Sequence, residues 1–252
     1  MTDHAIRDVV EQKRAKLLDD SNGLNAAAAA HPHAARTIGV GLLALDEVVP
    51  ARDWFRALAQ TWIATANDNW EAKYKTGSRA DAVAGPWREY IRGLYSAVLA
   101  GHNVERTVST VLERTTASFV ETLDKRQTAQ QLDLARALSS TLVDDTATVE
   151  HVRTLRQNLE TTGTPARKDH YEPYIRIVQH LNWDNDAMVA YGVHELVMSH
   201  GRFRDADIIR NSVAYKATAL LALARRAGAS IAYSYETIPD AVNGDTYYPV
   251  VE

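Results

Sequence analysis

The sequence contains no cysteine, which excludes disulfide bonds, thiolate metal sites and a cysteine nucleophile. It also has no run of about 20 apolar residues, the length that a membrane-spanning helix needs, and its first residues lack the apolar core of a signal peptide. No excess of charge points to a polyanionic partner, because 28 Lys and Arg residues stand against 32 Asp and Glu residues, a net charge of −4. We therefore expect a soluble, cytoplasmic protein that binds neither nucleic acid nor membrane.

The motifs of several enzyme classes are missing as well. The chain has no glycine-rich phosphate loop, no GxSxG nucleophile motif and no Rossmann fingerprint. Helical diiron enzymes carry Glu and His three positions apart so that both ligands share one helix face, but no Glu on the expected helices has a His at that spacing. The sequence therefore predicts no self-contained active site and no cofactor in this chain.

Four residues nevertheless remain candidates for a metal site of an unusual kind. They are His180, His194, Glu195 and His200. The HExxH motif of zinc peptidases is not present, because the pair at 194 and 195 is followed by a His at 200 instead of 198. Histidines six positions apart point to opposite sides of a helix, so a hydrogen-bonded core histidine is the more ordinary interpretation.

The most apolar segment of the chain is 183–200, WDNDAMVAYGVHELVMSH. Asp184 to Asp186 are typical capping residues, and no charged residue follows until the pair His194 and Glu195. A helix that is apolar on nearly every side needs other helices around it. We therefore expect a multi-helix bundle with this helix buried near its middle. Gly192 inside the helix further predicts a close contact with a neighbour, since Gly is unfavourable there by about 1 kcal/mol relative to Ala.

The whole chain is interpreted as one all-α domain with three parts. Residues 1–50 are an N-terminal helix or arm (3–18) followed by a linker that includes His31, Pro32 and His33. Residues 51–230 form the helical bundle. Residues 231–252 form a short extended tail rich in Tyr.

Apolar residues at spacings of three and four predict the helices of the bundle. They are expected over 53–74, 87–100, 104–138, 144–159, 171–181 and 205–227. Gly101 and Gly228 are expected to end two of them, and Gly163 with Pro165 marks a break over 161–167. The helix over 104–138 would be on the order of 50 Å long, a length that ferritin-like bundles use.

Two segments resemble the β subunit of the hydroxylase component of soluble diiron monooxygenases. The first segment consists of 182–186 (NWDND), Ala190, 194–196 (HEL) and 201–204 (GRFR). It is similar to the stretch in which DWNE opens a core helix of that family and a GxFxR-like turn ends it. The second segment consists of Glu89-Tyr90, Leu94-Tyr95, Arg106-Thr107, 117–119 and 123–125, and it resembles the paired long helices of the family.

The resemblance implies a ferritin-like protein that has lost its metal ligands. Such a chain would support a larger α subunit, which carries the diiron centre and hydroxylates or epoxidises a small hydrocarbon. The implied assembly is a hetero-oligomer with two-fold symmetry, with a small γ subunit, a regulatory protein and a reductase as further partners. The chain departs from the family in the shorter segment before its bundle, where β subunits carry a longer arm.

Our leading hypothesis is therefore a non-catalytic β-type subunit of a diiron monooxygenase hydroxylase. Two alternatives stay open. One is a free-standing helical scaffold or interaction protein. The other is a helical metalloenzyme that uses His180, His194, Glu195 and His200.

Overall fold

The computed structural model describes residues 3–74, 86–117, 120, 129–143, 146–202 and 208–244. Within these residues the chain forms thirteen helices and no strand, which confirms the all-α class. The helices are α1 (Asp3–Asp19), α2 (Leu24–Ala30), α3 (Pro32–Ala44), α4 (Val48–Tyr74), α5 (Trp87–Ala100), α6 (Val104–Thr115), α8 (Ala129–Leu142), α9 (Ala147–Thr162), α10 (Pro165–Leu181), α11 (Asp186–His200), α12 (Ile208–Ser212), α13 (Tyr215–Arg226) and α14 (Asp240–Asn243). The ferritin-like arrangement in particular stays a prediction.

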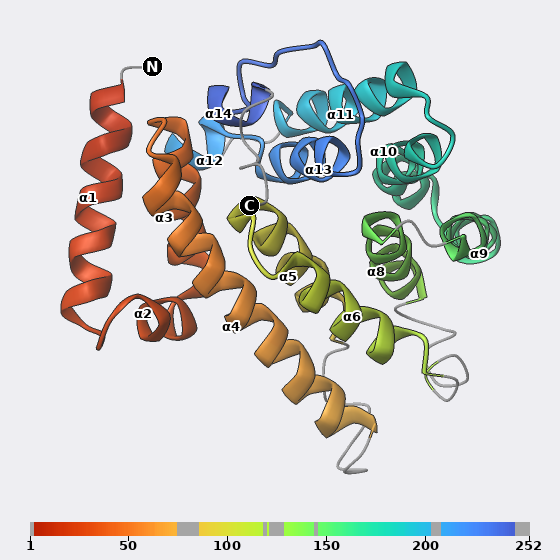
Figure 1. Cartoon of the computed structure of the whole chain (residues 1–252), viewed down its shortest axis with the longest axis horizontal. Helices are drawn as coiled ribbons and strands as arrows, with labels where there is room; N and C mark the ends of the chain where they lie inside the picture. Colours follow the sequence, from red (N-terminus) through yellow and green to blue (C-terminus); the bar gives the residue numbers. More distant parts are fainter. Residues whose placement is uncertain are drawn as a thin grey trace.

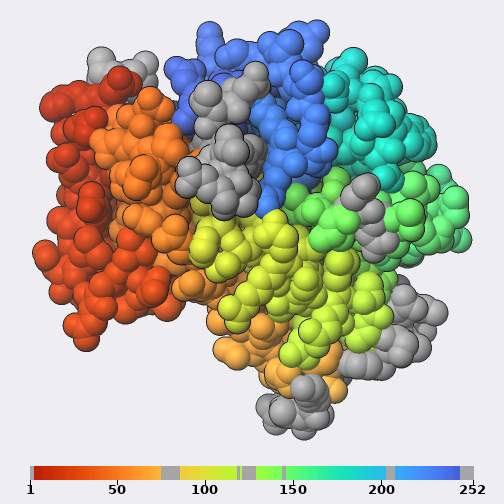
Figure 2. All heavy atoms as spheres, viewed as in Figure 1, coloured from red at the N-terminus to blue at the C-terminus, as the bar shows by residue number. Residues whose placement is uncertain are grey.

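Helices that follow one another in the chain pack side by side. The most extensive contacts join α3 to α4, α4 to α5, α8 to α9 and α10 to α11. Figure 1 shows α1 at one side of the molecule, α9 at the other, and α4, α5 and α6 in the middle. The space-filling view in Figure 2 shows α1 and α2 directly against α3 and α4. Buried apolar side chains from Ile6 in α1 to Val242 in α14 belong to one cluster.

The centre of the core is the α4–α5 pair. Helix α5 buries twelve of its fourteen residues. Trp54 and Phe55 of α4 and Trp87 and Tyr90 of α5 are among the largest fully buried side chains. Burying one such side chain contributes about 1.5–3 kcal/mol, so this pair supplies a large share of the hydrophobic stabilisation. The sequence placed the central helix at 183–200 instead, and that prediction is wrong.

The helix expected over 3–18 is confirmed as α1, but the segment interpreted as a linker forms α2, α3 and the start of α4. Gly41 of α3 has no room for a side chain, because a Cβ there would lie 2.4 Å from Val10 of α1. Helix α1 therefore lies directly on α3. Alanine is the strongest helix former, so residues 26–30 continue α2, and Pro32 occupies the first position of α3, where its missing N–H is not needed.

The single helix expected over 104–138 is also incorrect, since α6 ends at Thr115 and α8 begins at Ala129. The carbonyl oxygen of Thr115 accepts a hydrogen bond from Arg136 Nε at 2.9 Å. The hydroxyl of Thr116 donates to Leu112 O at 2.6 Å. In both bonds a side chain donates to a carbonyl group in the last turn of α6. Side chains therefore satisfy acceptors that a longer helix would bond to its own backbone, and this favours a helix end. Two residues of the predicted apolar pattern, Phe119 and Leu123, lie outside the described residues.

Other predicted boundaries are partly confirmed. Gly101 and Gly228 end their helices with positive φ angles of 64° and 96°. The helix expected over 205–227 is instead divided into α12 and α13, with residues 203–207 outside the described part. The break is at Ala214, whose N–H donates to Thr237 O of the tail at 2.8 Å.

The described part of the tail is packed against the body. Residues 231–235 have no regular structure, but α14 follows. Arg225 of α13 donates to Val242 O at 2.8 Å, and Ile231, Ile238 and Val242 are buried. The tail therefore covers the C-terminal part of α13. In the described ranges, no helix combines the length and the apolar character needed to cross a membrane.

Candidate functional site

Helix α11 buries one face. It contacts α10 and α13, and its buried residues are Val189, Ala190, Gly192, Val193 and Leu196. The burial predicted for the whole segment 183–200 therefore holds for one face. Apolar residues on both faces led to that prediction.

The local structure of α11 follows from its first residues and its glycine. The side chain of Asn185 caps the helix by accepting a hydrogen bond from Met188 N at 3.3 Å. A Cβ at Gly192 would lie 2.7 Å from Ile177 Cγ1 and 3.0 Å from Pro173 O, both on α10. The close contact predicted from this glycine is thus confirmed, and it fixes α11 against α10.

The opposite face of α11 presents large apolar side chains to solvent. Trp183, Tyr191 and Met198 are 56%, 49% and 54% exposed. Tyr191 and Met198 are seven residues apart, close to two helical turns, and therefore lie along one side of α11. Trp183 lies in the turn that precedes α11. We name these three residues the α11 stripe. Single exposed apolar residues are ordinary, whereas several large ones on one segment are less so.

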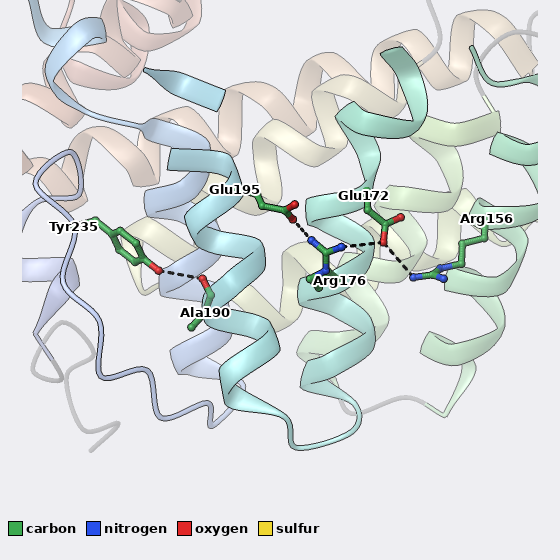
Figure 3. A network of polar contacts seen from close by, with 6 residues as sticks. All are labelled: Arg156, Glu172, Arg176, Ala190, Glu195 and Tyr235. Atoms are coloured by element: carbon green, nitrogen blue, oxygen red, sulfur yellow. Dashed lines mark hydrogen bonds and ion pairs between the residues drawn. The ribbon is translucent and has the colours of Figure 1, made fainter. Parts of the chain in front are cut away.

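Charged side chains from α9, α10 and α11 form a network beside Tyr191 of the stripe; Figure 3 shows the charged residues of this network. Arg176 of α10 forms an ion pair with Glu195 of α11, and its Nη2 lies 3.5 Å from Glu172 Oε1. Arg156 of α9 contacts the same Glu172 oxygen at 3.5 Å. The guanidinium of Arg176 also stacks on Tyr191, with 4.8 Å between its carbon and the ring centroid. The arrangement has an apolar centre and a polar rim, as protein interfaces do.

The tail forms hydrogen bonds to the first part of α11. The hydroxyl of Tyr235 donates to Ala190 O at 3.0 Å (Figure 3). Ser230 N donates to Asp186 Oδ2 at 3.1 Å. Asn243 holds the tail in place, since its Nδ2 donates to Tyr235 O at 2.9 Å. The stripe is therefore carried by a helix that is fixed by α10 and by the tail.

The four predicted site residues do not meet in one place. Glu195 is engaged by Arg176. His194 is exposed and its ring centroid lies 6.1 Å from that of Tyr235, whereas His200 Nε2 lies 3.3 Å from Asn211 O. Across the described ranges, no three His, Cys, Asp or Glu side chains come together as metal ligands could.

His180, the fourth candidate, has a different environment. Its ring meets Trp183 edge to face at 5.2 Å between centroids, and its Nδ1 atom is buried without a hydrogen bond. Burial lowers the pKa of His180, and the positive charges of Arg176 and Arg156 lower it further. Neutral imidazole can bind a metal, but the charged neighbours here are cationic and would repel one.

A separate hollow of about 350 Å³ lies between α4 and the beginning of α6. Polar side chains line it, among them Arg56, Asn67, His102 and Arg106. Its size suits a small molecule. None of the residues that line it is Asp or Glu, so it offers no carboxylate pair for acid–base catalysis.

The sequence reasoning missed Tyr191, Met198 and Arg176 as functional candidates. Tyr191 and Met198 could have been found, because they fall on one side of a helical projection, opposite 189, 193 and 196. The position of Arg176 could not, since it depends on how α10 meets α11. Comparison with protein families, curated proteins and solved structures finds no match to this chain.

Proposed function

We propose that this chain is a non-catalytic subunit that works by binding a larger helical protein through the α11 stripe. The supporting observation is the exposure of Tyr191 and Met198 on one side of α11 and of Trp183 in the turn before it. Aromatic residues, Met and Arg are the residue types that protein interfaces favour, and Arg176 lies beside the stripe.

The partner that we propose is the diiron-carrying α subunit of a monooxygenase hydroxylase. The pattern that resembles the family's β subunit consists of 182–186, Ala190, 194–196 and 201–204; it includes Trp183 of the stripe, and Trp183 and His194 of this pattern are exposed. Their presence is therefore not explained by core packing. In this proposal the protein is cytoplasmic and ferritin-like, holds no diiron centre itself, and joins a two-fold hetero-oligomer that includes a γ subunit, a regulatory protein and a reductase.

The exposed area of the stripe limits how much of an interface it can form. A large aromatic side chain buries about 150–250 Å² in full, so three half-exposed side chains offer roughly 300 Å². A stable interface buries about 800 Å² on each partner. The stripe can thus form the centre of an interface, with the side chains of Arg176, Glu195 and Glu172 in its rim. Binding energy is usually concentrated in such a centre.

The test is coexpression with the diiron α subunit that the proposal expects in the same operon, followed by affinity purification. The wild-type chain is expected to co-purify at equal stoichiometry. Tyr191→Glu and Met198→Glu should each abolish the complex, because they place a charge in the apolar centre. Val149→Glu is the matched control, since Val149 is an exposed apolar residue on α9, outside the stripe.

The outcomes separate the competing hypotheses. A stable monomer that ignores the α subunit would refute the proposed partner. If Tyr191→Glu and Met198→Glu then abolish capture of a different protein, the result supports the alternative of a free-standing interaction protein. If Val149→Glu disrupts the complex as much as Met198→Glu does, the stripe is not the interface.

A further inference from the structure

The hollow between α4 and the beginning of α6 stays open although the two helices are joined near their C-terminal ends. Trp70 Nε1 of α4 donates to Arg114 O of α6 at 3.2 Å, and Arg114 Nη1 lies 3.3 Å from Glu71 Oε1. The guanidinium carbon of Arg114 also lies 4.3 Å from the centroid of the Trp70 ring. Contact between α4 and α6 is otherwise slight, and small residues such as Ala59 and Thr107 line the hollow. Side chains of the described residues therefore leave this space unfilled.

The apolar part of the lining comes from α4 and consists of Ala59, Ile63 and Ala64. A Cβ at Gly93 of α5 would lie 2.6 Å from Ile63 Cδ1. The glycine therefore lets the end of the Ile63 side chain lie on α5. Because Ile63 is held in this way, the hollow keeps an apolar surface on which part of a bound molecule can pack.

Two polar side chains of the hollow have donors without an acceptor. The hydroxyl of Tyr90 donates to Asn67 Oδ1 at 2.7 Å, and burial raises the pKa of Tyr90, so the hydroxyl keeps this proton. The oxygen of the Asn67 amide is thus engaged, whereas its NH2 group has no partner among the described residues. Thr107 is only 8% exposed, yet its hydroxyl forms no hydrogen bond within the described ranges. Polar groups so placed are normally bonded, which indicates a missing acceptor.

The hollow also has one positive charge that no carboxylate balances. Its lining contains no Asp or Glu. Of its two arginines, Arg56 lies 3.2 Å from Asp53, but Arg106 has no ion pair in the described part of the chain. The neighbouring Glu105 pairs instead with Arg226 of α13. A positive charge beside unbonded donors favours a ligand that has a negative charge and several acceptor atoms.

We propose that this hollow binds the carboxylate of a small organic acid. The guanidinium of Arg106 supplies the charge and two parallel donors, and Thr107 and Asn67 supply neutral donors. The apolar body of the acid packs on Ile63 and the alanines beside it. A water molecule takes about 30 Å³ in the liquid, so a hollow of about 350 Å³ suits an acid of about ten heavy atoms.

The charge balance selects a carboxylate over a phosphate. A phosphate dianion would need a second cation without a carboxylate partner, and Arg56 is already paired with Asp53. The apolar wall likewise favours a ligand with a hydrocarbon part over a fully polar one. The hollow shares no residue with the α11 stripe, so this proposal is independent of the function proposed above.

A groove that only holds water is the simplest competing explanation. Water would satisfy Thr107 and Asn67 as well as a ligand does. It would give no preference for a carboxylate and no dependence of binding on Arg106. These two properties therefore decide between the explanations.

The experiment is an NMR titration of the full chain, labelled with ¹⁵N, with phenylacetate, an acid of about ten heavy atoms. Saturable shifts are expected for residues that line the hollow, including the side-chain amide signal of Asn67. Two fragments of the probe test its parts. 2-Phenylethanol lacks the carboxylate and acetate lacks the ring, and each should bind at least about tenfold more weakly, since each loses one group of contacts.

Three variants test the assigned residues. Arg106→Gln should weaken phenylacetate binding about tenfold or more, because it removes a charged hydrogen bond. Thr107→Val, which nearly keeps the shape of the side chain, should weaken it about fivefold. Ala64→Leu should abolish binding, because the larger side chain occupies the hollow.

Two matched controls lie on α1. Arg14→Gln removes an exposed arginine that has no ion pair in the described structure, and Ala15→Leu enlarges an exposed alanine. Both should leave phenylacetate binding unchanged. Arg106 and Ala64 are exposed, so their variants decide the question if the variant of the buried Thr107 does not fold.

Four results would overturn the proposal. They are the absence of saturable shifts, equal binding of 2-phenylethanol and phenylacetate, equal weakening by Arg14→Gln and Arg106→Gln, and unchanged binding by the Ala64→Leu variant. Loss of co-purification with the α subunit bears on the stripe alone.

Discussion

Replacing Gly192 tests whether α10 and α11 are as close as the structure has them. A methyl group there would lie 2.7 Å from Ile177 Cγ1 and 3.0 Å from Pro173 O. Ile177 is fully buried and the oxygen belongs to the backbone, so neither can turn away and the two helices must separate. Such overpacking costs about 1–3 kcal/mol, while Ala gains about 1 kcal/mol over Gly in helix propensity. Gly192→Ala should therefore destabilise by about 0–2 kcal/mol.

Gly192→Leu should be clearly worse, because three more heavy atoms enter the same space. We expect a loss of about 3 kcal/mol or more, which for a chain of this length lowers Tm by about 6 °C or more. Gly201→Ala is the control, since its Cβ would have no neighbour closer than 3.7 Å and its backbone is right-handed helical, with φ −63°. It should be neutral or stabilising by up to about 1 kcal/mol. Urea unfolding followed by circular dichroism measures all three, and a Gly192→Leu variant as stable as Gly201→Ala would refute the close contact.

Two further predictions concern buried charge and pH. Arg136→Met removes the buried charge that faces Asp133, 3.6 Å away, and also the donor to Thr115 O. The free energy of unfolding should fall by about 3–5 kcal/mol. The control Arg153→Met, at an exposed position, should change it little. Burial, Arg176 and Arg156 lower the pKa of His180 below its ordinary 6.5, so the unfolded chain takes up its proton at higher pH than the folded chain does. The contribution of neutral His180 to the free energy of unfolding is therefore fully present above about pH 6.5 and is lost as the pH falls toward the lowered pKa. In urea titrations at several pH values, His180→Gln should make the loss of unfolding free energy at low pH shallower. An unchanged dependence on pH would contradict the assignment.

The helix ends that could be predicted are those determined by local chemistry. Gly101 and Gly228 adopt positive φ, which glycine tolerates and other residues avoid, and both end their helices as expected. Pro32 at the start of α3 and the alanines of α2 are equally local signals. They indicated helices, and the interpretation of this segment as a linker gave them too little weight.

The helix ends that could not be predicted depend on distant partners. The apolar pattern runs on beyond Thr115, but Arg136, 21 residues away, takes the carbonyl of Thr115. The helical pattern across Ala214 is broken where its N–H bonds Thr237 of the tail. Spacing along the sequence contains no information on either bond. Both breaks therefore became visible only with the tertiary structure.

The stripe lies between these two cases. Tyr191 and Met198 are seven residues apart, so their alignment on one side of a helix could have been predicted from the sequence. The position of Arg176 over the Tyr191 ring depends on how α10 packs against α11, and no spacing along the chain predicts it.

The composition of α11 is what ties its fold to its proposed function. A helix at the edge of a domain normally has one apolar face and one polar face, because water covers the second. In α11 the face that carries Val189, Val193 and Leu196 is buried, yet Tyr191 and Met198 on the other face are also apolar. The fold of a single chain requires only the first face. The second face becomes favourable only when another molecule covers it, and without a partner the same surface would promote self-association.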